Sequence, residues 1–176
     1  MPPHILLSRI EVDGKHIYTL TGDAQPMTPE GQHEMAIAVL EMFSGGEIMV
    51  LAGMSASAER KEVFSITSCA SYRIELESKG VDVRRSEPEA GVIGLAALIT
   101  ALGPLKNVKT SCTIATTLGN SVDPVAAQLL LETIRKWWDL PLPVPIDATE
   151  RLAQKVRNMQ TGNQKDLISE LSESPD

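Results

Sequence analysis

The chain has 176 residues, 43% apolar and 22% charged, which is an ordinary composition for one domain with a buried core. Its 16 basic and 23 acidic residues give a formal net charge of −7 without a basic block, which argues against nucleic acid as a main partner. No apolar run approaches the roughly 20 residues that span a bilayer. The first residues, Met1-Pro2-Pro3-His4, do not start a signal peptide. We therefore expect a soluble cytoplasmic protein that binds neither nucleic acid nor a membrane.

The residues that most often bind metals are few and scattered. Cys69 and Cys112 each lie in an apolar segment, so we expect buried thiols and neither a disulfide nor half of a metal site. The histidines His4, His16 and His33 do not lie at metal-ligand spacing. We expect no metal and no cofactor.

The first part of the chain predicts a β-hairpin and then a helix. Two β-rich runs, 4–12 and 15–21, flank Asp13-Gly14, a pair that two-residue turns prefer because both residues tolerate positive φ. Thr28-Pro29 then predicts an N-cap followed by proline at the first helical position, and Gly45-Gly46 predicts the helix end.

The middle of the chain alternates short apolar runs with helical patterns. The expected strands are 47–53, 63–67, 81–83 and 108–117, and the expected helices are 69–78, 91–102 and 124–138. Continuous apolar runs between helices are typical of parallel strands covered on both faces. We therefore expect a three-layer α/β fold with a mostly parallel central sheet and an N-terminal hairpin. Segments 48–51 and 113–115 are expected to be neighbouring, fully buried strands.

The last part of the chain predicts two helices and a tail. Asp123-Pro124 predicts a second capped helix start. Its apolar stripe is expected to contain Ala126, Ala127, Leu130, Leu131, Ile134, Trp137 and Trp138. The segment 140–145, rich in proline, predicts an extended strap. We expect an α/β domain over 1–146, a C-terminal helix over 147–162 and a disordered acidic tail over 163–176.

Two glycine-containing loops invite a catalytic or phosphate-binding interpretation. The segment Gly53-Met54-Ser55-Ala56-Ser57 resembles the nucleophile elbow G-x-S-x-G, but its last glycine is missing and no histidine follows it. Gly91 and Gly94 precede a helix without the lysine of a phosphate-binding loop. Small residues at crowded sheet ends explain both patterns, so we assign no catalytic residue.

A ligand crevice is nevertheless predicted by topology. Loops at the carboxyl ends of strands line the crevice of open α/β sheets. Segments 53–57, 88–94 and 116–121 are therefore expected to meet at one mouth. The candidate crevice residues are Gly53, Ser55, Gly91, Gly94, Thr116 and Asn120. A vestigial crevice without a ligand fits the same pattern.

Three segments carry a resemblance to a known family: 31–53, 89–95 and above all 121–127, with the sequence Ser-Val-Asp-Pro-Val-Ala-Ala. In their order and spacing the chain resembles the proteasome assembly chaperone family, and in particular the archaeal relatives of the second eukaryotic chaperone subunit. The resemblance runs from Met1 to about Gln160 and implies a phosphorylase-like α/β fold. It also implies that the chain lacks the N-terminal strand–helix unit with which family members begin.

The leading hypothesis is a non-enzymatic protein-binding module that resembles such a chaperone, with proteasome subunits as implied partners. The alternative is an enzyme or small-molecule binder that takes a nucleoside or phosphate in a phosphorylase-like crevice. The enzyme question stays open, although the residues favour a protein without catalysis. A missing unit leaves apolar surface and a strand edge bare, so we expect a homo-oligomer. The candidate interface residues are Ile5, Leu7, Leu129, Trp137 and Trp138.

Overall fold

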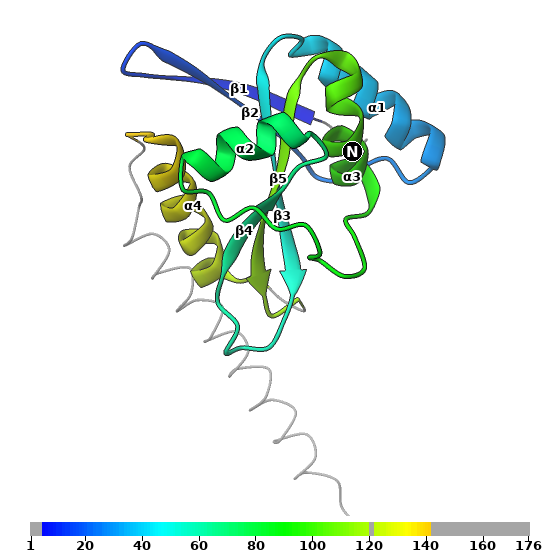
Figure 1. The fold of residues 1–176 in the computed structure, drawn as a ribbon. Coiled ribbons are helices and arrows are strands. Elements are labelled where there is room, and N and C mark those ends of the chain that lie inside the picture. The colour runs from blue at the N-terminus through cyan, green and yellow to red at the C-terminus, as the bar shows by residue number, and fades with distance from the viewer. Residues whose placement is uncertain (1–4, 120–121, 142–176) are drawn as a thin grey trace, which may run out of the picture.

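The structure, a computed structural model, describes residues 5–119 and 122–141. It opens with the predicted hairpin, in which β1 (Ile5–Val12) pairs antiparallel with β2 (Lys15–Gly22). Asp13 and Gly14 form the turn with φ angles of 49° and 74°, which confirms the turn inferred from this residue pair. Figure 1 shows the hairpin as an arm that extends away from the other elements.

Two helices begin where the capping signals predict. The Thr28 side chain accepts a hydrogen bond of 3.1 Å from the Gly31 N–H at the start of α1 (Pro29–Met42). The Asp123 carboxylate accepts one of 3.0 Å from the Ala126 N–H at the start of α4 (Pro124–Trp138). Both predicted helices are confirmed. Each cap satisfies a backbone N–H that the first turn of a helix leaves without a partner.

The central sheet is mixed, and the expectation of a mostly parallel sheet is wrong for the described strands. Its order is β3-β5-β4, with β3 (Glu47–Ser55) parallel to β5 (Lys109–Thr117) and β4 (Val63–Ile66) antiparallel to β5. A parallel return needs a crossover of a dozen or more residues. Only the loop 56–62 joins β3 to β4, so β4 runs back in the opposite direction.

Helices cover both faces of the sheet. On one face, α1 and α3 (Gly94–Leu102) pack against the side chains of Ile48 and Val50 from β3. On the other face, α4 packs against Val63 and Ala115 of β4 and β5. The helix α2 (Ala70–Ser78) lies at the end of α4, where Tyr72 contributes to a cluster with both tryptophans.

The strands β3 and β5 are neighbours as predicted, but only β5 is fully buried. Residues Thr113 to Ala115 are at most 3% exposed. In β3, by contrast, Leu51 is 55% exposed. The prediction that 48–51 is fully buried is wrong, because β3 is an edge strand of the described sheet and α4 packs over β4 and β5.

Smaller differences have local causes. The helix expected from residue 91 begins only at Gly94, because Gly91 has a φ angle of 73°, which the interior of a right-handed helix does not allow. Segment 81–83 forms a single parallel bridge between Ser65 and Val83 and no full strand. Most of the strap 140–145, the C-terminal helix 147–162 and the acidic tail 163–176 lie outside the described residues.

Candidate functional site

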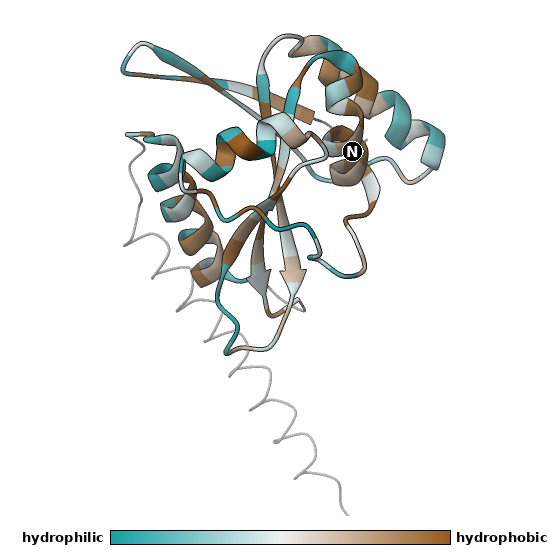
Figure 2. Cartoon of the chain, viewed as in Figure 1, coloured by the Kyte–Doolittle hydropathy of each residue, from teal (hydrophilic) through white to brown (hydrophobic). Residues whose placement is uncertain are grey.

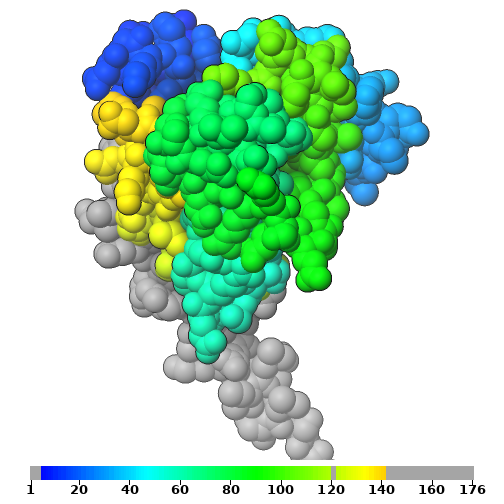
Figure 3. All heavy atoms as spheres, viewed as in Figure 1, coloured from blue at the N-terminus to red at the C-terminus, as the bar shows by residue number. Residues whose placement is uncertain are grey.

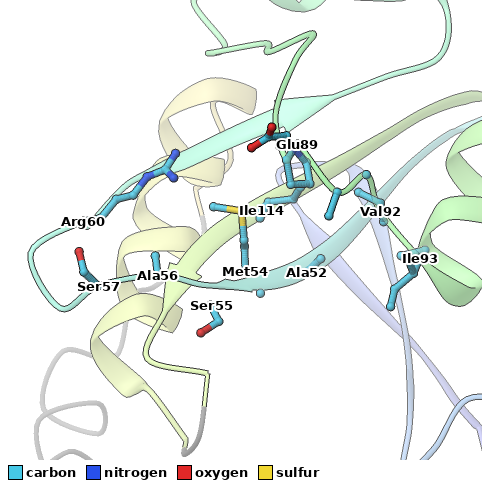
Figure 4. Close-up of a pocket in the computed structure, with 15 residues that line it drawn as sticks. Ala52, Met54, Ser55, Ala56, Ser57, Arg60, Glu89, Val92, Ile93 and Ile114 are labelled. Carbon is cyan, nitrogen blue, oxygen red and sulfur yellow. The ribbon is translucent and has the colours of Figure 1, made fainter.

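A cavity of about 520 Å³ lies over the carboxyl end of β3, on the face of the sheet that α3 covers. Its floor is apolar and consists of Ala52, Met54, Ile114 and Ala96, while the loop 88–93 forms the opposite wall. In Figure 4 the Met54 side chain points from β3 toward this loop, near Glu89, whereas Ile93 lies at the other end of the cavity, beyond Ala52. The polar groups that line the cavity, among them Arg60, Ser57 and Glu89, come from its surrounding loops.

An ion-pair network fixes the wall that contains Arg60. The Arg60 guanidinium pairs with Glu62 and, at 2.6 Å, with Glu87. Arg84 pairs with the same two carboxylates at 2.8 and 2.7 Å and also with Asp82 at 2.9 Å. These contacts join the loop after β3 to the loop 84–88, so they hold the two sides of the cavity mouth together.

The network also sets the charge states at the cavity mouth. The hydrogen bond from Arg84, supported by Arg60, lowers the pKa of Glu62 from 4.5 to about 2 although partial burial opposes the shift. The same two arginines lower the pKa of Glu87. Arg84 also lies 4.3 Å above the Phe64 ring centroid. Because its guanidinium is neutralised by Glu62 and Glu87, Arg60 offers little free positive charge to an anionic ligand.

The structure brings three of the six predicted crevice residues to this cavity. Gly53, Ser55 and Gly91 line it, whereas Gly94 lies beside Gln25 at the start of α3. Thr116 is buried and has a structural role, since its hydroxyl donates to the Arg60 carbonyl at 2.6 Å and accepts from the Glu62 N–H at 3.0 Å. Asn120 lies outside the described residues.

Ser55 lines the cavity at the end of β3 but does not direct its hydroxyl into it. Figure 4 shows its side chain pointing away from Met54, to the other side of the strand. There it lies against Gly119, where a Cβ atom would overlap the Ser55 hydroxyl. The hydroxyl therefore has a packing role at the sheet end.

The residues that sequence reasoning missed are the floor residues Met54 and Ile114 and the arginines Arg60 and Arg84. The signal for the arginines was present as two short charged runs, 59–62 and 82–89, that carry both signs. Their pairing across the fold depends on loop positions that no local pattern specifies.

Other functional groupings are limited in the part of the chain that the structure describes. No cluster of His, Cys, Asp and Glu side chains there could hold a metal ion. None of the helices in 5–119 and 122–141 is long and apolar enough to span a bilayer.

The predicted interface residues divide into two groups. Ile5 and Leu7 are exposed on the hairpin, at 43% and 45%. Leu129, expected off the main stripe of α4, packs with Trp137 against the cluster of Val63, Ala115 and Ala126. Trp138 donates its indole N–H to Glu47 at 2.6 Å, so a part of each tryptophan is used within the chain.

The chain is similar to known proteins over most of its length. A model of the PAC2 family matches residues 1–165. The uncharacterized protein MJ1210 of Methanocaldococcus jannaschii is 22% identical over 149 residues, which are 83% of this chain and 56% of that protein. The chain thus spans little more than half the length of this curated relative.

Solved structures show the same fold at low sequence identity. Pyrococcus furiosus PbaA, an archaeal homolog of proteasome-assembly chaperone, is 19% identical with a TM-score of 0.68, over 94% of this chain and 75% of that one. Pyrococcus furiosus PbaB, an archaeal proteasome activator, is 23% identical with a TM-score of 0.71, over 92% and 71%. The Mycobacterium tuberculosis proteasome-assembly chaperone homologue Rv2125 is 15% identical with a TM-score of 0.62, over 89% and 68%.

Proposed function

Because this chain belongs to the PAC2 family, we propose that it is a protein-binding module that acts without catalysis and has proteasome subunits as partners. Two solved structures of similar fold are described as an archaeal homolog of proteasome-assembly chaperone and an archaeal proteasome activator. This similarity supports the class of partner. The surface that meets the partner has to be argued from this chain.

The observation that carries the proposal is the apolar hairpin arm. Cross-strand pairing places Ile5, Leu7, Tyr18 and Leu20 on one face of the hairpin, and each of these side chains is at least 37% exposed. Figure 2 shows apolar stretches along the hairpin between its polar tip and the body, and Figure 3 shows it at one corner of the visible surface. A two-stranded hairpin is only marginally stable alone, and exposed apolar patches mark protein contacts.

Self-association belongs to the same proposal. Ile5 and Leu7 supply exposed apolar area for a homo-oligomer, with the outer parts of Trp137 and Trp138 as additional contacts. The proposal includes a cytoplasmic location, with neither nucleic acid nor a membrane as a partner. The net charge of −7 supports the exclusion of nucleic acid.

The test is affinity purification from the native cell, followed by mass spectrometry and by binding measurements with purified proteasome subunits. We expect the wild type to recover proteasome subunits and Leu7→Asp to bind them about tenfold or more weakly, because a desolvated carboxylate opposes an apolar contact. Ile74→Asp, at a 62% exposed position on α2, is the matched control and should bind normally. Recovery of no proteasome subunit, or equal binding by both variants, would contradict the proposal.

A second candidate, small-molecule binding, is favoured by one observation: the cavity of about 520 Å³ at the predicted crevice. Its phosphorylase-like interpretation would place a nucleoside or phosphate there. The apolar floor and the neutralised Arg60 favour a nucleoside over free phosphate. Thermal unfolding with adenosine, guanosine, uridine and inorganic phosphate tests this. A concentration-dependent rise in Tm with a nucleoside supports it, and no rise with the whole panel refutes it.

A further inference from the structure

The strand β3 has one outer edge that the described chain leaves without a hydrogen-bonding partner. The Gly46 carbonyl accepts from the Lys109 N–H at 3.2 Å, and the Ala56 N–H donates to the Thr117 carbonyl at 2.9 Å. Since the direction of the backbone N–H and C=O groups alternates along a strand, the even-numbered residues of β3 direct these groups toward β5. The odd-numbered residues from Glu47 to Ser55 therefore direct their N–H and C=O groups outward. Among the described residues, none bonds to these groups.

The opposite edge of the sheet, formed by β4, has hydrogen-bonding partners. There, the Ser65 N–H of β4 donates to the Asp82 carbonyl at 2.8 Å, and the Arg84 N–H donates to the Ser65 carbonyl at 2.9 Å. Segment 82–84 thus covers the β4 edge, whereas no segment within 5–119 and 122–141 pairs with the outer edge of β3. An open edge that carries an apolar side chain, here the 55% exposed Leu51, is a template for pairing with another strand.

We propose that the β3 edge pairs antiparallel with the β3 edge of a second copy of this chain, with Leu51 on the two-fold axis. This inference rests on the self-association in the proposed function and names its surface. It joins the two three-stranded sheets into one continuous sheet. A two-fold axis requires that the strand be complementary to itself.

The sequence of β3 meets this requirement. With Leu51 on the axis the whole strand overlaps, so that Leu51 faces the second copy's Leu51, Met49 faces Gly53 and Glu47 faces Ser55. A long side chain thus meets a glycine, and the only charge on the strand meets a hydroxyl instead of its own copy. The Glu47 carboxylate is in addition held by Tyr72 and Trp138, each at 2.6 Å. The two paired β3 strands therefore place no like charges opposite each other, although the chain has a net charge of −7.

The first experiment compares molar mass by light scattering and by sedimentation at micromolar concentration. We expect the wild type to be a dimer or a larger assembly built from dimers. Leu51→Lys places like charges opposite each other and should weaken self-association by about tenfold or more. Leu105→Lys, at a 79% exposed position, should keep the wild-type mass. Leu51→Lys with the wild-type mass would overturn the inference.

The second experiment covers the case in which Leu51→Lys does not fold. In a Cys69→Ser background, Leu51→Cys should form a covalent dimer on oxidation, because hydrogen-bonded antiparallel pairs hold their Cα atoms about 5.5 Å apart. Ile74→Cys is the control and should cross-link far less. Equal cross-linking at both positions overturns the inference.

These outcomes are separate from the fate of the proposed function. An oligomeric wild type that keeps its mass in Leu51→Lys and cross-links no better through Leu51→Cys overturns the β3 pairing alone. A monomeric wild type that still binds purified proteasome subunits refutes the pairing and the self-association, while the partner proposal stands. A β3-paired dimer that binds no proteasome subunit supports the pairing and refutes the partner.

Discussion

Removal of the Arg84 guanidinium tests the ion-pair network at the cavity mouth. Arg84→Gln keeps much of the side-chain stem above Phe64 but removes the charge that Glu62, Glu87 and Asp82 share. The variant leaves Arg60 as the described ion-pair partner of Glu62 and Glu87. We expect the folded state to lose stability without losing its fold.

The magnitude follows from the pKa of Glu62. Arg84 is the largest cause of its fall from 4.5 to about 2, and at about 1.4 kcal/mol per tenfold change in proton affinity the whole effect is at most ~3.5 kcal/mol. Arg60 contributes a share, and the 29% exposed Glu62 side chain is screened by water. We therefore expect Arg84→Gln to lower the free energy of unfolding at pH 7 by about 1–2 kcal/mol.

The free energy of unfolding should depend on pH in a direction that the lowered pKa of Glu62 determines. A carboxylate whose pKa is lowered by folding stabilises the protein above its unfolded pKa, and this contribution is lost as the pH falls through the folded pKa. The wild type should thus lose the Glu62 contribution between about pH 4.5 and pH 2. In Arg84→Gln the pKa of Glu62 is closer to 4.5, so less stability remains to be lost on acidification.

Urea unfolding followed by circular dichroism at pH 7 and near pH 2.5 measures both effects. The difference between wild type and Arg84→Gln should shrink on acidification. The control is Arg85→Gln, because Arg85 is exposed and forms no ion pair within the described residues. It should change stability by less than about 0.5 kcal/mol at either pH. An Arg84→Gln variant as stable as the wild type at pH 7, or a difference independent of pH, would refute the reasoning.

Three further outcomes are expected. Ser55→Ala should leave any ester hydrolysis by the protein unchanged in turnover assays, because the Ser55 hydroxyl faces away from the cavity; a loss of several orders of magnitude would contradict this. A thiol reagent at pH 8 should modify Cys69 in the folded protein and Cys112 only in denaturant, since burial raises the pKa of Cys112 to about 11; equal rates would contradict this. Gly119→Ala should cost about 1–3 kcal/mol in urea unfolding, from its φ of 79° and the overlap with Ser55. Gly14→Ala, with a φ of 74° but open space, should cost less; an equal cost would contradict the overlap.

The elements that the sequence predicted well are those with local signals. Asp13-Gly14 determines its turn through the backbone of two residues. Thr28 and Asp123 each cap a helix by accepting a hydrogen bond from the backbone N–H three residues later in the sequence. Of the three segments expected to meet at one mouth, 53–57 and residues 88–93 line the cavity, whereas no described residue of 116–121 does. These features depend on residue chemistry that acts over one turn or one strand end.

The features that could not be predicted depend on pairing between distant segments. The apolar run of β3 has the composition of a buried strand, and its edge position follows only from which strand lies beside β5. The same holds for the antiparallel direction of β4. Arg84 and Glu62 are 22 residues apart, and no periodic pattern links them. Composition therefore indicated the layers, whereas the sheet order decided which residues are accessible.

The position of the two tryptophans determines what fluorescence can report about this protein. Trp137 and Trp138 are the only tryptophans in the sequence, and both lie at the end of α4, with Trp138 bonded to Glu47. Their emission follows the docking of α4 against α2 and the start of β3. The hairpin carries Tyr18 as its aromatic residue, packed 5.8 Å from the Phe43 ring. Because the hairpin itself contains no tryptophan, binding of a partner to it is best followed with a dye attached to β1 or β2.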